Sequence, residues 1–183
     1  MSETPRIITV FGGSRCTQDA PEYAEAMRLG RLLAEHGYSV CSGGYLGVME
    51  AVSRGAHEAG GHVLGITMNQ FQAEPNRYLK EKIATDHFYD RLQHLIRRSS
   101  GFIAVRGGMG TVTELSLVWN KLVMRIISDV PLILLGDCWP PVFEAWRQHL
   151  VISEDDLRYI HFAATAEEAV QVLQHYHAPQ LRL

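Results

Sequence analysis

Ten residues in the second half of the chain decide the fold: Val105-Arg106-Gly107-Gly108-Met109-Gly110-Thr111-Val112-Thr113-Glu114. They follow a short apolar run, residues 101–105, and lead into residues 115–123, whose apolar side chains recur at helical spacing. The pattern predicts a strand, a glycine-rich turn and the start of a helix. Three glycines within four residues let a ligand approach the backbone. Because the first N–H groups and the positive dipole end of a helix face such a turn, the stretch predicts a phosphate site.

The same order of strand, turn and helix recurs along the chain. Hydrophobic patterning predicts strands at residues 7–11, 38–41, 62–67, 81–85, 101–105, 130–135 and 159–162. It predicts helices at residues 21–36, 48–59, 88–100, from the glycine turn to about 124, 141–150, 153–157 and 166–176, and a loop or lid at 68–80. Alternating strands and helices predict a three-layer, Rossmann-like α/β fold with a central, mostly parallel sheet and helices on both faces. With no internal repeat or linker, we expect one nucleotide-binding domain over residues 1–183.

Composition narrows the class of protein and of partner. The chain is 46% hydrophobic and 20% charged, which is ordinary for a soluble globular protein. A net charge of -3 lacks the basic signature of polyanion binding, so we expect no nucleic acid polymer as partner. Three cysteines without a C-x-x-C motif favour a reduced, cytoplasmic protein. Neither a signal peptide nor a membrane-length apolar run is visible, so we expect no membrane association.

Three glycine turns follow predicted strands and should meet at one edge of the sheet. They are Gly12-Gly13-Ser14, Gly43-Gly44 and residues 107–110. In a parallel sheet, ligands bind in the crevice at the carboxyl ends of the strands. The predicted helix 88–100 runs antiparallel to the strand after it, so its first turn, with Arg91, returns to this edge. Glu114 is expected in the first turn of the helix after the glycine turn. Topology therefore brings together an arginine, a carboxylate and the glycine turn at 107–110, which we call the phosphate cradle.

Each of these features also has a purely structural interpretation. Residues 111–114 fit T-x-x-E, in which Thr111 is the N-cap and Glu114 its reciprocal partner in a capping box. Arg91 can be a solvated charge or half of an Arg–Glu ion pair. The glycine pair at 43–44 can be a tight turn and nothing more. The residues alone leave these alternatives open.

Other chemical motifs are missing from the sequence. It contains neither the Walker A pattern nor G-x-S-x-G, and the turn at Gly12 lacks the G-x-G-x-x-G of dinucleotide folds. The pair His175 and His177 is interpreted as a polar chain end. We therefore expect no metal and no cofactor.

Residues 107–114, G-G-x-G-T-x-x-E, resemble the signature of the LONELY GUY (LOG) family. The members of this family are cytokinin riboside 5′-monophosphate phosphoribohydrolases and were long mislabelled as lysine decarboxylases. The likeness extends over roughly residues 7–136. It includes the opening strand and Gly-Ser turn at 10–14, a second glycine segment at 42–51, and the strand segment at 58–66.

The resemblance implies hydrolysis of the N-glycosidic bond of a nucleoside 5′-monophosphate, AMP or a cytokinin riboside monophosphate, to free base and ribose 5-phosphate. It places the catalytic arginine at Arg91 and the catalytic glutamate at Glu114. It implies a substrate site formed by Ser14, Gly43, Gly44, Gly107, Gly108, Met109, Gly110 and Thr111. It also implies a homodimer with the site near the interface, for which the helix carrying Trp119 is a candidate contact.

The chain departs from the family pattern at three positions. Arg106 replaces the usual proline before the glycines, Leu92 replaces the lysine after the catalytic arginine, and Glu50 stands where plant-like members tend to have glycine. Arg106 either adds a phosphate contact or crowds the loop and changes the substrate.

Two other functions are weighed against this one. Related folds serve as molybdenum-cofactor carriers, so the alternative is a non-catalytic nucleotide or molybdenum-cofactor carrier protein. The decarboxylase label is disfavoured, because the chain has only Lys80, Lys82 and Lys121 and no recognisable pyridoxal-phosphate lysine context.

Overall fold

One parallel sheet of seven strands organises the computed structural model, which describes residues 6–178. The strands are β1 (Ile7–Phe11), β2 (Ser39–Ser42), β3 (Val63–Met68), β4 (Glu81–Thr85), β5 (Ser99–Val105), β6 (Leu132–Leu135) and β7 (Ile160–Ala163). Their order in the sheet is β4-β3-β2-β1-β5-β6-β7, and every neighbouring pair is parallel. The predicted Rossmann-like architecture is confirmed.

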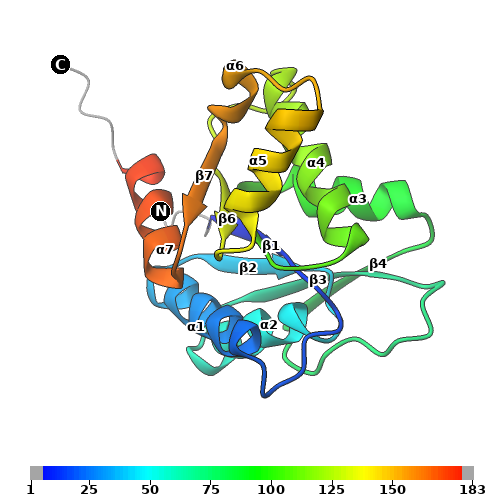
Figure 1. Ribbon diagram of the computed structural model, residues 1–183. Helices are drawn as coiled ribbons and strands as arrows, with labels where there is room; N and C mark the ends of the chain where they lie inside the picture. The colour runs from blue at the N-terminus through cyan, green and yellow to red at the C-terminus, as the bar shows by residue number, and fades with distance from the viewer. Residues whose placement is uncertain (1–5, 179–183) are drawn as a thin grey trace.

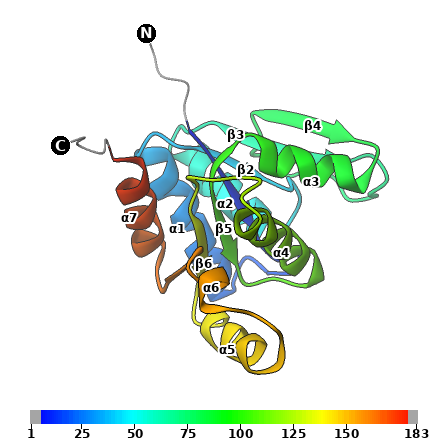
Figure 2. The ribbon, with the colours of Figure 1, turned by 90° about the horizontal axis from the view of Figure 1, so that it is seen from above.

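Helices cover both faces of this sheet (Figure 1). One face carries α1 (Pro21–Glu35), α2 (Val48–Glu58) and α7 (Ala166–His177). The other carries α3 (Phe88–Arg97), α4 (Met109–Val123), α5 (Trp139–His149) and the short α6 (Glu154–Leu157). Seen from above, α1 and α7 lie on one side of the sheet and α3, α4 and α5 on the other (Figure 2). The sheet is therefore the middle of three layers.

The central strands are apolar throughout because both of their faces are covered. In β5, Phe102 and Ala104 pack into the core under α3, α4 and α5, whereas Ile103 and Val105 pack into the core under α1, α2 and α7. The residues of β6 alternate between the two cores in the same way. This double burial is typical of parallel sheets and explains why the strands were visible in the sequence as apolar runs.

Several element boundaries differ from the prediction by one to three residues. The helix expected at 88–100 ends at Arg97, and β5 begins at Ser99 rather than at 101. The Ser99 hydroxyl donates back to the carbonyl of Leu95 at 2.8 Å, and Ser99 already pairs with Ile7 of β1. The helix expected from 141 begins at Trp139, because prolines are tolerated in the first turn of a helix, where backbone N–H groups have no partner within the helix.

The sheet order reverses between β1 and β5. From β1 the chain builds outward through β2, β3 and β4, then crosses back so that β5 lies on the other side of β1. The crevice outside the carboxyl ends of these two strands is the usual ligand site of such a fold. The glycine turns at Gly13 and Gly107 follow these two strands.

Across residues 6–178, every helix is too short or too polar to span a lipid bilayer. Cys16, Cys41 and Cys138 are all free.

Candidate active site

The three glycine loops meet at Gly13. Its N–H donates to the carbonyl of Arg106 at 3.2 Å, and its carbonyl accepts from the N–H of Val48 at 2.9 Å. A methyl group on Gly13 would lie 3.2 Å from the Cα of Gly107, and one on Gly47 would lie 2.3 Å from the Gly13 oxygen. The loops after β1, β2 and β5 are thus packed main chain against main chain. The predicted convergence of these loops at one edge of the sheet is confirmed.

A cavity of about 780 Å³ lies at this junction. This size is in the range of small-molecule sites. Its walls come from the loops at residues 12–17 and 106–111, from the loop after β3, and from the first turns of α1, α2 and α3. Arg91 and Glu114 both line it.

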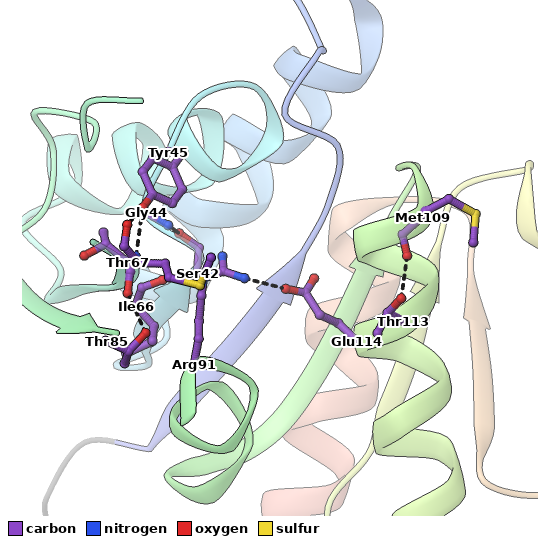
Figure 3. Close-up of polar contacts among 11 residues, drawn as sticks. Ser42, Gly44, Tyr45, Ile66, Thr67, Thr85, Arg91, Met109, Thr113 and Glu114 are labelled. Atoms are coloured by element: carbon purple, nitrogen blue, oxygen red, sulfur yellow. Dashed lines mark hydrogen bonds and ion pairs between the residues drawn. The ribbon is translucent and has the colours of Figure 1, made fainter. Parts of the chain in front are cut away.

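Arg91 and Glu114 form a buried ion pair in the cavity wall. Nη1 of Arg91 lies 3.4 Å from Oε1 of Glu114, and the two side chains are 8% and 12% exposed. Nε of Arg91 donates to the carbonyl of Ile66, at the end of β3, at 3.0 Å. Figure 3 shows Arg91 reaching from α3 toward Glu114 on α4. The return of the first turn of α3 to the ligand edge, predicted from topology, is confirmed.

The guanidinium of Arg91 is enclosed by neighbouring groups on several sides. A methyl group on Gly43 would lie 2.2 Å from Nη2 of Arg91 and 2.7 Å from the sulfur of Met49. On another side, the ring centroid of Phe71 lies 5.9 Å from Cζ of Arg91, within cation–π range. The absence of a side chain at Gly43 therefore makes the room that Arg91 occupies.

Burial raises the pKa of Glu114 to about 7, and the neighbouring Arg91 opposes this shift without cancelling it. A carboxyl group with this pKa exchanges its proton near neutral pH, as a group that handles protons in a reaction must. A strongly shifted pKa in a cavity is also a common mark of a functional site.

The helix after the glycine turn begins earlier than predicted. It starts at Met109 with Gly108 as N-cap, and among the described residues no side chain caps it. Thr111 is its third residue, and a methyl group on Gly107 would lie 2.1 Å from the buried Thr111 hydroxyl oxygen. Glu114 consequently lies in the second turn, not the first, and points at Arg91. The capping-box interpretation of Thr111 and Glu114 is therefore wrong.

The bare start of α4 faces the cavity. Gly107, Gly108, Met109, Gly110 and Thr111 all line it. Because the first N–H groups of a helix have no partner within the helix, they are free to bind an anion there.

The remaining predicted substrate residues separate into two groups. Ser14 lines the cavity. Gly43 and Gly44 are buried behind its wall, where Gly43 faces Arg91 and Gly44, at φ +78°, packs on Gly65. Their expected place in the pocket lining is not what the structure shows, because Arg91 and Met49 lie between Gly43 and the open space.

Two aromatic side chains that line the cavity, Phe71 and Phe88, were not predicted from the sequence. Phe71 lies in the loop after β3, and Phe88 opens α3. Phe71 also packs on Tyr45, with ring centroids 5.5 Å apart. Only their positions in the sequence could have indicated a place in the site. Phe71 follows a strand that ends at the ligand edge, and Phe88 lies one helical turn before Arg91.

Trp119 is a core residue and not a surface contact. Its ring centroid lies 5.2 Å from that of Phe143 and 6.3 Å from that of Trp146. Its indole N–H donates to the carbonyl of Asp156 at 2.8 Å. α5 covers this side chain within the same chain, and the contact of its helix with a second copy stays a prediction.

Arg106, which replaces the family proline, binds α1. Its Nη1 lies 2.8 Å from Oε1 of Glu22, and both residues line the cavity. The guanidinium of Arg106 is therefore held by α1, at the edge of the cavity that the glycine turn also lines.

Within residues 6–178, no cluster of three or more His, Cys, Asp and Glu side chains could hold a metal ion. Of the two tail histidines, His177 hydrogen-bonds the carbonyl of Ser100 at 2.9 Å and the hydroxyl of Tyr38 at 3.2 Å. Both ring nitrogens of His177 therefore have partners within the chain.

Comparison with known proteins supports the resemblance seen in the sequence. The cytokinin riboside 5′-monophosphate phosphoribohydrolase LOG of Oryza sativa subsp. japonica is 32% identical over 182 residues, which cover 93% of this chain and 74% of that protein. The pyrimidine/purine nucleotide 5′-monophosphate nucleosidase of Escherichia coli (strain K12) is 31% identical over 149 residues. These residues cover 74% of this chain but only 32% of the nucleosidase.

A solved structure gives the same fold. The molybdenum cofactor binding protein from Rippkaea orientalis superposes with a TM-score of 0.78 at 25% identity, covering 95% of this chain and 98% of that one. The model of the SLOG cluster4 family matches residues 5–170, which is most of the chain. Together with the rice relative, this match shows that the chain belongs to the SLOG cluster4 family, among the LOG proteins.

Proposed function

We propose that this protein hydrolyses the N-glycosidic bond of a nucleoside 5′-monophosphate, giving the free base and ribose 5-phosphate. The observation that carries the proposal is the buried Arg91–Glu114 pair, placed in one cavity with the bare start of α4. The names of the rice and Escherichia coli relatives support the same reaction class.

The phosphate is the group that positions the substrate. Backbone N–H groups of residues 108–111 bind its oxygens, and the helix dipole of α4 favours its charge. Arg91 contributes a buried cation to the same cavity. Ser14 lines the same cavity, and its hydroxyl donates to the phosphate or the ribose in this proposal. Fixing one end of the substrate at several points holds the scissile bond near Glu114.

Glu114 carries the chemistry. As the bond between C1′ and the base nitrogen breaks, its electron pair leaves with the base and positive charge develops on the ribose. The Glu114 carboxylate stabilises this charge and takes a proton from the water whose oxygen bonds to C1′. Arg91 orients the carboxylate. The proton is then passed to the departing base, so atoms and charge balance.

The base lies against the apolar side of the cavity. Tyr45, Met49, Phe71, Ala73 and Phe88 form this side. Aromatic rings there provide stacking surfaces, which accept any base because every base has a π face. We therefore propose AMP and other 5′-monophosphates as substrates, with a cytokinin riboside monophosphate as one member of the series.

The experiment is a product assay. The protein is incubated with AMP, isopentenyladenosine monophosphate, CMP and UMP, and the free base is measured by chromatography. We expect base release from AMP and little from adenosine, which lacks the phosphate. Failure to release base from every monophosphate would refute the proposal.

The second candidate is a non-catalytic carrier of a nucleotide or of the molybdenum cofactor. The likeness to the Rippkaea orientalis protein favours it. Tight binding of a nucleotide or a pterin phosphate without turnover, measured by calorimetry and the product assay together, would select this function instead.

We also propose a homodimer in the cytoplasm. Exposed apolar side chains beside the cavity, Phe88, Tyr89 and Met109, support a contact with a second copy. The three free cysteines fit a reducing compartment. Sedimentation of the wild-type protein and of Tyr89→Glu tests the dimer, which the charge should weaken.

A further inference from the structure

Two of the helices that begin at the cavity, α1 and α4, differ in what faces the free N–H groups of their first turns. The first turn of α1 carries Glu22, whose carboxylate lines the cavity. Its own backbone N–H and the guanidinium of Arg106 hold the pKa of Glu22 below its usual range. The first turn of α4, residues 109–112, carries only Met, Gly, Thr and Val. A carboxylate of the protein thus occupies the positive end of α1, while the positive end of α4 is open to a ligand.

Arg106 stands between these two helix starts. Its backbone is fixed, because its carbonyl accepts from the N–H of Gly13 and its neighbour Gly107 packs on the same residue. Its side chain is 68% exposed and lines the cavity next to the cradle. A second arginine also lies near the glycine turn, since Nη2 of Arg15 is 3.7 Å from the position of a methyl group on Gly108.

The Arg106–Glu22 bond is of the kind that is easily exchanged. An ion pair between exposed side chains contributes little, since water solvates both partners well when they separate. A guanidinium binds a phosphate through two parallel charge-assisted hydrogen bonds, which are stronger than a single contact with a carboxylate. Only the side chain has to move, because the backbone of Arg106 already lies beside the phosphate cradle.

We infer that Arg106 is a ligand of the substrate phosphate and that Glu22 competes with the phosphate for it. In the empty site Arg106 binds Glu22, and in the occupied site it binds the phosphate. Because Glu22 competes for Arg106, the protein binds ribose 5-phosphate less tightly than it would if Glu22 were absent. The identity of the ligand rests on the proposed function, while the exchange itself rests on the Arg106–Glu22 geometry.

A double-mutant cycle tests the inference. Arg106→Ala, Glu22→Gln and the double variant are compared by KM and kcat for AMP and by calorimetric Kd for ribose 5-phosphate. We expect Arg106→Ala to raise KM and Kd about 10- to 100-fold with kcat nearly unchanged, the size of a charged hydrogen bond. We expect Glu22→Gln to lower both by up to about fivefold, the size of an exposed ion pair. The double variant should match Arg106→Ala.

Two controls separate this exchange from general effects. Arg28→Ala removes another exposed Arg–Glu pair of α1, with Glu167, and should leave KM and Kd unchanged. Arg106→Lys keeps the positive charge but not the planar, two-pronged guanidinium. Its KM and Kd should lie between those of wild type and of Arg106→Ala. Circular dichroism and Tm establish that each variant is folded.

An unchanged Kd in Arg106→Ala would overturn the inference, as would an effect of Glu22→Gln that persists without Arg106. Absence of any ribose 5-phosphate binding to the wild type would overturn it too. If the wild type binds ribose 5-phosphate in the expected pattern but releases no base, the proposed function fails and the exchange stands. If base is released but Arg106→Ala behaves as wild type, the exchange alone fails.

Discussion

Nη1 of Arg91 lies 3.4 Å from Oε1 of Glu114, although the two residues belong to different helices, α3 and α4, separated by strand β5. Both side chains are almost removed from water, and Arg91 is additionally fixed by the carbonyl of Ile66. A buried pair of this kind costs desolvation and is weak evidence for a contribution to stability. Its place in the wall of the cavity points to a role in the reaction instead.

Glu114→Gln should lower kcat for AMP by at least about 100-fold, because the amide can neither take a proton nor stabilise positive charge. Arg91→Lys should lose a comparable factor, since lysine lacks the fork that holds both Ile66 and Glu114. The measurement is base release by chromatography. The matched control is the exposed pair Arg147–Glu144, whose variants Arg147→Lys and Glu144→Gln should keep wild-type rates. Full activity of Glu114→Gln would show that Glu114 is structural.

The pH dependence of the reaction follows from the pKa of Glu114, which is about 7. Only the carboxylate form is competent, so kcat/KM for AMP should rise with pH and level off above about 7. The second ionisation of the substrate phosphate has a pKa of about 6 and adds a separate rise to the pH profile. In the residual activity of Glu114→Gln, the rise of kcat/KM due to the phosphate should remain, and the rise near pH 7 should disappear. A flat profile between pH 6 and 8 in the wild type would contradict this role.

The same group should leave a mark on stability. The pKa of Glu114 in the folded protein, about 7, is higher than its ordinary value of 4.5, so the folded protein binds more protons than the unfolded chain between these pH values. The contribution of Glu114 to the free energy of unfolding is therefore at its full value below a pH of about 4.5 and is lost as the pH rises through 7. We expect the Tm of wild type relative to Glu114→Gln to fall between pH 5 and pH 8. An unchanged difference in Tm over this range would argue against the shifted pKa.

Gly43→Ala should reduce activity by displacing Arg91, since the new methyl group would lie 2.2 Å from Nη2. The expected loss in kcat is about 10- to 100-fold, because small misplacements of catalytic groups have effects of this order. Gly30→Ala is the control. Its methyl group would clash with the carbonyl oxygen of Val52 at 2.1 Å, between α1 and α2. It should lower Tm while the folded fraction retains the wild-type kcat.

Phe71→Ala should raise KM for every monophosphate by a few fold and leave Tm nearly unchanged. The ring is 44% exposed, so its removal leaves little new void, but it forms part of the apolar side of the cavity and covers Arg91. Stacking on an aromatic ring contributes about 1–3 kcal/mol per base, which sets the upper limit of the loss. The control is Phe162→Ala, an exposed aromatic residue on β7. A change in kcat without a change in KM would place Phe71 in the chemistry instead of in binding.

Much of the fold was predictable because its causes are local and repeat. Strands such as β5 carry apolar side chains on both faces, which is typical of a parallel sheet covered on both sides. The glycine turns follow these strands, so their common edge followed from strand direction alone. Even Arg91 was predictable in position, because a helix that precedes a parallel strand must begin at the edge where that strand ends.

The sequence by itself therefore determined the parallel sheet, the ligand edge and the neighbourhood of Arg91 and Glu114, while the tertiary structure decided what these residues are. The T-x-x-E pattern at 111–114 fits a capping box as well as a catalytic site, and only the start of α4 at Met109 excludes the cap. The burial that raises the pKa of Glu114 comes from segments remote in the chain, so no local pattern contains it. The partner of Arg106 is Glu22, 84 residues away, because the packing of the loops after β1 and β5 on Gly13 brings the two side chains together.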